Sequence, residues 1–361
     1  MRISYVLPEY YAGPSGGHHV HYTFAGLLQA RGHDVTLFIP QYLVADRSVK
    51  GRIAGRIWAA RVRLRNRPLF PFFALHPDVG VRLVPDLGPR SLPRADAVIA
   101  TSWRTAELLR HLPADRGRKH YIVYDYEIWM TAPAPLRARI GGTFTDAFRI
   151  VATSEVGRQM IRSCGTEPAD LIACGTDAVA FGCDVAPEQR APLTFAFPSR
   201  PEDFKGTADA VAAAVALRAV YGDRLAVTSF GYEQVAMPAW VRWSGRPSQA
   251  ELRRLYNSNA VFVTPSHYEG WGLPAVESMV CGCALVTADN GGCRDYARDE
   301  ATALVVPPRQ PARLAEAIDR LLRDDALRLR LAHAGQQEAR RFNWDVAGAR
   351  LERLLTALGP A

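Results

Sequence analysis

The stretch AVFVTPSHYEGWGLPAVESMVCGCALVT spans residues 260–287 and contains one complete strand–helix–strand unit. Its beginning, Ala260 to Thr264, is a short apolar run typical of a buried strand, and Ala284 to Thr287 form a second one. Between them Pro274, a favoured early residue of a helix, opens a helical stretch that ends at Cys281. Because continuous apolar strands joined by a helix pair in parallel, this unit predicts an α/β fold with helices on both faces of the sheet.

The same alternation runs through the rest of the chain. Further apolar runs predict strands at residues 3–7, 35–39, 81–84, 97–100, 121–123, 150–152, 193–197, 225–229 and 303–306. The polar, proline-bounded segment 186–192 interrupts the pattern and predicts a domain boundary. We therefore expect two Rossmann-like, doubly wound domains facing a cleft, where ligands bind at the carboxyl ends of the strands. The expected domains are residues 1–187 and 188–341, followed by a C-terminal helix over 342–361.

The composition is that of an ordinary globular protein. The 361 residues are 48% apolar and 22% charged, which excludes a collagen-like, coiled-coil or wholly disordered chain. No apolar run reaches the ~18 residues that a membrane span needs, and the start lacks the long apolar region of a signal peptide. We therefore expect a cytoplasmic protein.

The six cysteines form no C-x-x-C pair and no zinc-like set with nearby histidines. We expect reduced, buried thiols and no metal site. A three-thiol site from Cys281, Cys283 and Cys293 is the weaker alternative.

The net charge of +8 is concentrated in one stretch. Residues 47–67 contain no acidic side chain, and their eight basic ones account for the whole excess. Because a nucleic-acid-binding protein carries a broad basic face, that class is disfavoured. We interpret the stretch as a solvated surface excursion; the alternative is a peripheral contact with an anionic membrane or an anionic acceptor. The eight residues are Arg47, Lys50, Arg52, Arg56, Arg61, Arg63, Arg65 and Arg67.

A glycine-rich loop follows the first predicted strand and ends with Gly16 and Gly17, ahead of a helix. The backbone N–H groups at such a helix start favour an anion, typically a phosphate, although a purely structural turn has the same pattern. The spacing is not G-x-G-x-x-G, and Pro40 and Gln41 follow the second strand, where dinucleotide-binding proteins place a carboxylate. A nicotinamide-dependent dehydrogenase is therefore disfavoured.

A more specific pattern lies in the quoted stretch, from His267 to Glu277. Its glycines, at positions 270 and 272, leave backbone amides open to a ligand. We expect Glu269 in the loop and Glu277 in the first turn of the helix. Two carboxylates at one sheet edge can accept hydrogen bonds from the vicinal hydroxyls of a sugar and of a ribose. An ordinary capped helix does not require this combination.

The pair Glu269 and Glu277 resembles the E-x7-E motif of family-4 glycosyltransferases, which are retaining enzymes of the GT-B fold. The resemblance covers most of the chain and is most specific in its C-terminal half. Other matching elements are Ser199–Gly206 with Arg200 and Lys205, Gly231, Gly245–Arg246, Ala288–Asp295 with Asp295 in place of a glutamate, and Phe342–Trp344 at the start of a helix that crosses back to the first domain.

The resemblance implies transfer of a hexosyl group from a nucleotide-diphosphate sugar to an acceptor hydroxyl, with retained configuration and without a metal or other cofactor. The second domain would hold the donor, and the first would face a cell-envelope glycan, a lipid or a secondary metabolite as acceptor. Arg200 and Lys205 would stabilise the charge on the leaving diphosphate, Glu269 would hold the sugar hydroxyls and Glu277 the ribose. Further donor contacts would come from Gly16, Gly17, Gly231, Arg246, Gly270, Trp271, Gly272 and Leu273.

The chain departs from the family at one position. Many members carry a His-Asp pair after a strand of the first domain, and here Tyr124 and Asp125 stand there. Only Asp125 matches, and the resemblance assigns it a catalytic role. A tyrosine hydroxyl titrates near ~10 and does not shuttle protons at neutral pH. His18 and His19, expected in the glycine loop, are the candidate substitutes.

Two other functions fit the same architecture. A nucleotide-sugar 2-epimerase would release nucleoside diphosphate without an acceptor, and a non-catalytic relative would bind the donor without turnover. The intact Glu269, Glu277, Arg200 and Lys205 argue against the non-catalytic relative, and dependence of the release on an acceptor would separate the transferase from the epimerase.

Overall fold

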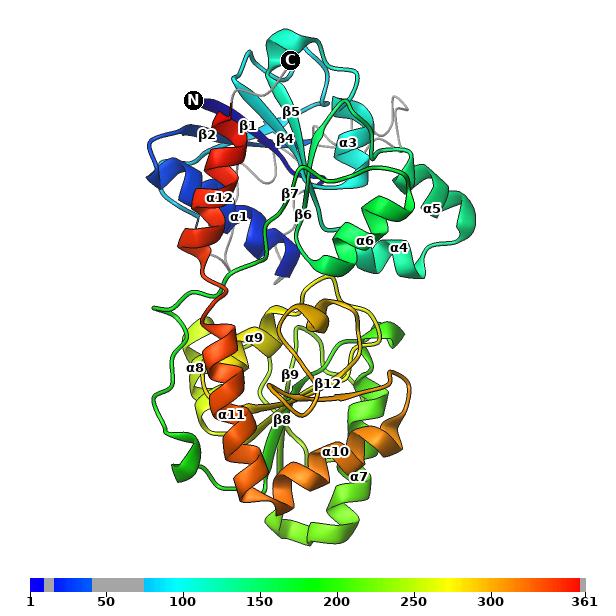
Figure 1. Cartoon of the computed structure of the whole chain (residues 1–361), viewed down its shortest axis with the longest axis vertical. Helices are drawn as coiled ribbons and strands as arrows, with labels where there is room; N and C mark the ends of the chain where they lie inside the picture. Colours follow the sequence, from blue (N-terminus) through cyan, green and yellow to red (C-terminus); the bar gives the residue numbers. More distant parts are fainter. Residues whose placement is uncertain (10–15, 41–74, 358–361) are drawn as a thin grey trace. The chain divides into compact units, whose positions relative to one another are not determined.

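The computed structural model describes residues 1–9, 16–40 and 75–357. The chain forms two units, one made of Met1–Ala173 with Trp344–Ala361 and the other of Cys174–Asn343 (Figure 1). The basic stretch 47–67 lies outside the described residues, so both interpretations of it stay predictions.

The first unit is built on a seven-stranded parallel sheet in the order β3-β2-β1-β4-β5-β6-β7. Helices cover it, among them α1 (Gly16–Ala30), α3 (Trp103–Leu109), α4 (Tyr126–Thr131), α5 (Ala134–Gly141) and α6 (Glu155–Ser163). The inner strands are apolar and buried, as the sequence predicts for a sheet covered on both faces. The strands are β1 (Arg2–Val6), β2 (Asp34–Pro40), β3 (Gly80–Val84), β4 (Ala97–Ala100), β5 (Arg118–Val123), β6 (Arg149–Ala152) and β7 (Asp170–Leu171).

The second unit has a six-stranded parallel sheet in the order β10-β9-β8-β11-β12-β13. Its core joins these strands to the helices α7 (Thr207–Tyr221), α10 (Pro311–Arg323) and α11 (Asp325–Ala339), while α8 (Gln249–Asn257) and α9 (Leu273–Val280) complete the unit. The strands are β8 (Thr194–Pro198), β9 (Ala226–Phe230), β10 (Arg242–Trp243), β11 (Val261–Thr264), β12 (Ala284–Ala288) and β13 (Leu304–Val306).

Each sheet has a point where the strand order reverses, between β1 and β4 in the first unit and between β8 and β11 in the second. The loops after these strands diverge at the carboxyl edge, which is where open α/β sheets bind their ligands. In the second unit these two loops carry Lys205 and Glu269. In the first unit α1 starts at this edge with Gly16 and Gly17.

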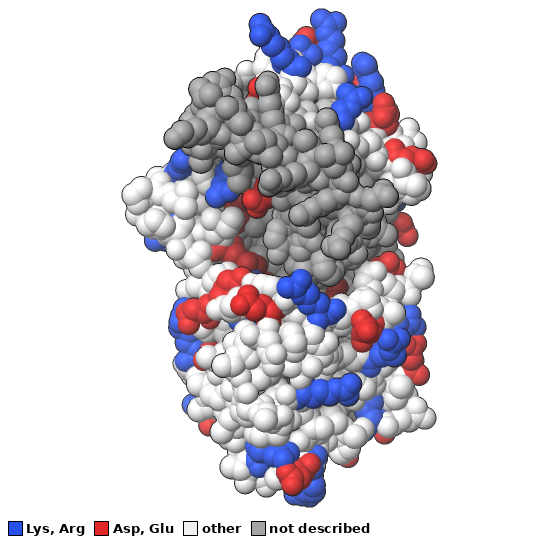
Figure 2. All heavy atoms as spheres, turned by 180° about the vertical axis from the view of Figure 1, so that it is seen from behind, with Lys and Arg blue, Asp and Glu red and all other residues white. Residues whose placement is uncertain are grey.

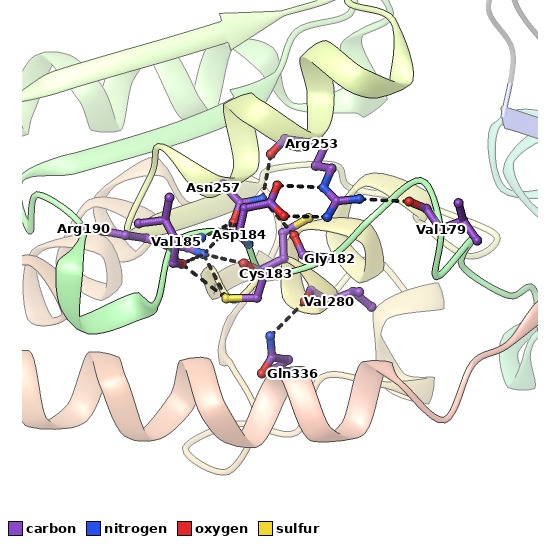
Figure 3. A network of polar contacts seen from close by, with 11 residues as sticks. Val179, Gly182, Cys183, Asp184, Val185, Arg190, Arg253, Asn257, Val280 and Gln336 are labelled. Atoms are coloured by element: carbon purple, nitrogen blue, oxygen red, sulfur yellow. Dashed lines mark hydrogen bonds and ion pairs between the residues drawn. The ribbon is translucent and has the colours of Figure 1, made fainter.

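The boundary between the units lies earlier in the chain than residue 187, because the segment after Ala173 packs onto the second unit. Arg190, from the polar segment that resembles a linker, is only 5% exposed. Its guanidinium donates a hydrogen bond to the main-chain carbonyl of Val185 at 2.8 Å (Figure 3). It also donates to the carbonyls of Tyr256 and Asn259, at 3.2 and 3.0 Å. Main-chain acceptors thus hold a cation inside the second unit at a place where the sequence suggests a solvated linker.

The C-terminal helix α12 (Trp344–Thr356) belongs to the first unit, as predicted, and packs against α1. The ring of Trp344 meets that of Phe24 edge to face, with centroids 5.4 Å apart. At the other end of α12, Arg118 and Arg149 both donate to the carbonyl of Ala357, at 2.8 and 3.2 Å. Cations at a helix C-terminus also complement its dipole.

Basic and acidic side chains are interspersed over the visible face of the second unit (Figure 2). No helix within the described ranges is long and apolar enough to cross a membrane. All six cysteines are free thiols.

Candidate active site

Lys205 and Glu269 meet at the strand-order reversal of the second sheet. Lys205 ends the 3-10 turn Asp203–Lys205 after β8, and Glu269 lies in the loop between β11 and α9. The ammonium nitrogen of Lys205 lies 3.0 Å from Oε1 of Glu269, and the two side chains are 18% and 15% exposed. The structure therefore brings two of the predicted site residues, 64 positions apart, into one ion pair.

Gly206 allows the loop of Lys205 to approach the loop of Glu269. Its φ of 66° is left-handed, and a Cβ there would lie 2.1 Å from the carbonyl oxygen of Pro265. Only glycine fits this conformation at this distance.

The backbone of Glu269 is fixed from the other side by the loop after β12. Its N–H donates to the carbonyl of Asn290, and its carbonyl accepts from the N–H of Gly292, both at 3.0 Å. A Cβ on Gly292 would lie 2.7 Å from the backbone nitrogen of Trp271. The paired glycines of the predicted Gly-Gly element thus hold the glutamate loop by close backbone contact.

Arg200 lies beside Gly231: a Cβ added at Gly231 would lie 3.1 Å from a guanidinium nitrogen of Arg200. Its guanidinium donates to the carbonyl of Ser199 at 2.9 Å and lies over the ring of Tyr232, 5.2 Å from the ring centroid. A Cβ on Gly231 would lie 2.3 Å from the Ser199 carbonyl. The exposed Arg246 donates to the backbone carbonyl of Tyr232, so it joins the same cluster.

Glu277 lies in the second turn of α9, not the first, because the helix begins at Leu273, one residue before Pro274. Its Oε2 accepts a hydrogen bond from the hydroxyl of Tyr256 at 3.0 Å. Burial raises the pKa of the Glu277 carboxyl to about 7, and the Tyr256 hydrogen bond offsets part of this rise. Tyr256 was not among the predicted site residues.

The loop between the two glutamates is closely packed. Gly272 has a φ of 96°, and a Cβ there would lie 2.7 Å from the hydroxyl of Tyr296. The ring of Trp271 is 5% exposed and meets the rings of Tyr296 and Phe342 at centroid distances of 5.6 and 5.0 Å. Gly270 and Leu273 are partly buried beside them.

In the first unit α1 begins at Gly16, earlier than predicted, so His18 and His19 lie in the helix and not in a loop. Gly16 and Gly17 are exposed at its N-terminus. Burial lowers the pKa of His18.

The histidine in contact with Tyr124 is His21, which the sequence analysis missed. The two rings lie edge to face with centroids 4.7 Å apart, and Nδ1 of His21 lies 3.1 Å from the hydroxyl of Tyr5. Burial lowers the pKa of His21 well below its ordinary value. Its spacing of three residues from His18 on one helix is the sequence signal that could have indicated it.

Asp125 is 2% exposed and bonds within the first unit. Its Oδ2 accepts hydrogen bonds from the N–H of Trp103 at 3.0 Å and from the hydroxyl of Tyr121. Burial raises the pKa of this carboxyl to about 6, against the effect of those two bonds. These contacts fix the start of α3 on β5, and the catalytic role of Asp125 stays a prediction.

The described residues contain no group of three or more His, Cys, Asp or Glu side chains that could hold a metal ion.

The family model matches part of the second unit, whereas the structural matches extend over nearly the whole chain. Residues 222–338 match the family model of the glycosyl transferases, group 1. A curated relative, the D-inositol 3-phosphate glycosyltransferase of Frankia alni, is 39% identical over 122 residues. That alignment covers 34% of this chain and 30% of the relative, so the chain spans under a third of the relative's length.

Solved structures match over nearly the whole chain. Sucrose-phosphate synthase from Thermosynechococcus elongatus has a TM-score of 0.74 at 18% identity, with 98% of each chain covered. Anabaena HepE in complex with UDP and glucose has a TM-score of 0.74 at 14% identity, covering 99% of this chain and 100% of that one. The chain therefore has the GT-B fold, with two Rossmann-like parallel-sheet domains.

Proposed function

We propose that the protein is a retaining family-4 glycosyltransferase that moves a hexosyl group from a nucleotide-diphosphate sugar to an acceptor hydroxyl. The observation that carries the proposal is the Lys205–Glu269 ion pair at the strand-order reversal of the second sheet. Glu269 and Glu277 lie within the stretch that matches the group 1 glycosyl transferases, and Lys205 precedes that stretch in the sequence. The relative's name, and the UDP and glucose in the HepE structure, support a nucleotide sugar as donor.

The cations of the second unit would act on the leaving group. In the transition state the bond between the anomeric carbon and the diphosphate oxygen breaks, and negative charge grows on the diphosphate. Lys205 and Arg200 stabilise this charge because it exceeds the charge in the ground state. The N-terminus of α9 and the amides from Gly270 to Leu273 would add fixed dipoles to the same group.

The carboxylates would orient the donor. Glu277 accepts hydrogen bonds from the two ribose hydroxyls, and Glu269 accepts them from the transferred sugar. Retention follows from attack on the same face that the diphosphate leaves. The acceptor oxygen bonds to the anomeric carbon, and its proton passes to an oxygen of the departing diphosphate. This step requires no metal and no covalent enzyme intermediate.

In the first unit Asp125 would position the start of α3, and the pair His21–Tyr124 would supply contacts to the transferred sugar. Gly16 and Gly17 would offer the N-terminus of α1 to the diphosphate. The acceptor is proposed to be a cell-envelope glycan, a lipid or a secondary metabolite.

The first experiment is a thermal-shift screen of nucleotide sugars, because a ligand that binds the folded state raises the melting temperature. Release of nucleoside diphosphate is then measured with and without candidate acceptors, and the anomeric configuration of the product is determined by NMR. Release that needs an acceptor, with a retained anomer, supports the proposal. Release without an acceptor would indicate the 2-epimerase or a hydrolase, and binding without turnover the non-catalytic relative.

A further inference from the structure

His267 bonds the loop that carries Glu269 to the loop that carries Lys205. Its backbone N–H donates to the carbonyl of Phe204, the residue before Lys205, at 2.7 Å. Its ring nitrogen Nε2 lies 2.8 Å from Oδ2 of Asp209 in the first turn of α7. One residue thus contacts both the turn that ends in Lys205 and the helix that follows it.

The His267–Asp209 pair is largely buried. The side chains of His267 and Asp209 are 5% and 21% exposed. Nδ1 of His267 is buried and has no hydrogen-bond partner among the residues that the structure describes. Because a carboxylate oxygen only accepts, Nε2–H of His267 is assigned as the donor to Asp209.

Besides the Lys205–Glu269 ion pair, two further close contacts join the two loops. Gly206 passes the carbonyl of Pro265 at a distance that admits no side chain, and Ser266 reaches the carbonyl of Lys205 with its hydroxyl at 3.5 Å. The His267–Asp209 hydrogen bond ties the glutamate loop to α7 through two side chains. Loss of it would let the Lys205 turn and the Glu269 loop shift relative to one another.

We propose that His267 and Asp209 are positioning residues that set the Lys205 ammonium against Glu269. They act through Lys205 and do not contact the donor. The effect on turnover rests on the proposed function, whereas the effect on the ion pair does not.

The first test observes the ion pair directly and requires no activity. The sequence has only three lysines, Lys50, Lys119 and Lys205, so the lysine side-chain signals of protein labelled with ¹⁵N-lysine are resolved and assigned by single substitutions. His267→Phe keeps the bulk of the ring and removes the donor, and His267→Gln offers an amide donor in place of Nε2. We expect the Phe variant to shift the Lys205 signal toward that of Glu269→Gln, and the Gln variant to retain most of the parent position.

The second test asks whether the pair acts through Lys205. Asp209→Ala should lower kcat about 10- to 100-fold and change donor KM by less than about threefold, as expected from displaced catalytic groups. In the Lys205→Ala background the same change should cost nothing further, because the group it positions is gone. His333, which pairs with Glu188 at 2.6 Å on an exposed surface of the same unit, supplies the control His333→Phe with unchanged kcat.

The outcomes separate the two claims. An unmoved Lys205 signal in folded His267→Phe protein overturns the inference, as does an equal loss from Asp209→Ala with and without Lys205. If no nucleotide sugar is bound or turned over by the parent protein, the proposed function fails while the lysine signal still tests the positioning role.

Discussion

Nucleotide-sugar binding is expected to weaken steeply below neutral pH because of Glu277. Burial raises the pKa of this carboxyl to about 7, from an ordinary value of 4.5. Ribose hydroxyls bind best as donors to an ionised carboxylate, which has only acceptor sites. The fraction of protein that is competent to bind therefore falls as the pH decreases through 7.

The size of the effect follows from that fraction. The apparent dissociation constant is the intrinsic one divided by the ionised fraction, so binding is about tenfold weaker at pH 6 and about 100-fold weaker at pH 5 than in alkaline solution. Glu277→Gln cannot titrate, and its affinity should be low and independent of pH. Tyr256→Phe removes the hydrogen bond that lowers the pKa of Glu277, so its profile should move to higher pH.

The assay is isothermal titration with an intact nucleotide sugar between about pH 5 and 9. Free nucleoside diphosphate is unsuitable, because its terminal phosphate titrates near ~6 and would mimic the effect. The titration of Glu277 itself acts on stability in the opposite direction: a raised carboxyl pKa makes the protein lose stability as the pH rises from 4.5 to 7. An affinity that stays constant from pH 5 to 8, or an unchanged profile in the Gln variant, would refute the reasoning.

Three further predictions concern single side chains. Lys205→Ala and Arg200→Ala should each lower kcat about 100-fold, which corresponds to roughly 3 kcal/mol of transition-state stabilisation. Lys119→Ala is the control and should leave kcat unchanged. If both variants have the kinetics of the parent protein, the two cations do not belong to the site. Burial lowers the pKa of His120 from 6.5 to about 3, so the free energy of unfolding should decrease as the pH falls below 6.5, by up to about 1.4 kcal/mol per pH unit. Urea titrations should show that slope reduced in His120→Leu, and an identical slope would contradict the assignment. Arg190→Met should cost about 3 kcal/mol in the same titrations, because buried carbonyls lose their donor, and a variant as stable as the parent would count against it.

The strands were predictable because their apolar runs are the sequence signature of a covered parallel sheet. Predicted and observed bounds agree at β4, Ala97–Ala100, and differ by a residue or a few elsewhere. The two strands that the pattern missed are β7, Asp170–Leu171, and β10, Arg242–Trp243. Each has two residues and lies at a sheet edge, so it contains no apolar run for the pattern to detect.

The boundary between the two units was harder to predict than the strands. The polarity of a segment does not show whether its side chains bond to solvent or to buried groups of the protein. A proline-bounded segment with Arg190 has the composition of a solvated linker, yet its guanidinium bonds to buried main-chain carbonyls. Such acceptors are present at every residue and leave no mark in the sequence. They become specific only when the fold directs several of them at one point.

The sequence predicted candidate site residues only where they belong to a recognisable motif. Lys205 and Glu269 follow strands that flank the reversal point, so topology brings them together. Asp209 and Tyr256 belong to no motif considered, and His267 begins the stretch 267–277 but was given no role. The contacts of all three depend on how α7 and α8 pack beside the two loops. Those contacts arise at the level of packing, where sequence spacing carries little information.

The lysine at position 205 suits a cation that pairs with Glu269 and, under the proposed function, also binds the diphosphate of the donor. Of the 44 cationic residues only three are lysines, so arginine is the chain's usual cation and the lysine here is an exception. A guanidinium is a planar fork that fixes its partner in one geometry, whereas an ammonium is a compact charge on a flexible stem. The ammonium of Lys205 lies 3.0 Å from Oε1 of Glu269 and neutralises this carboxylate. Under the proposed function the same group turns to the diphosphate once sugar hydroxyls bond to Glu269, a small rotation that lysine allows and a bidentate arginine pair would resist.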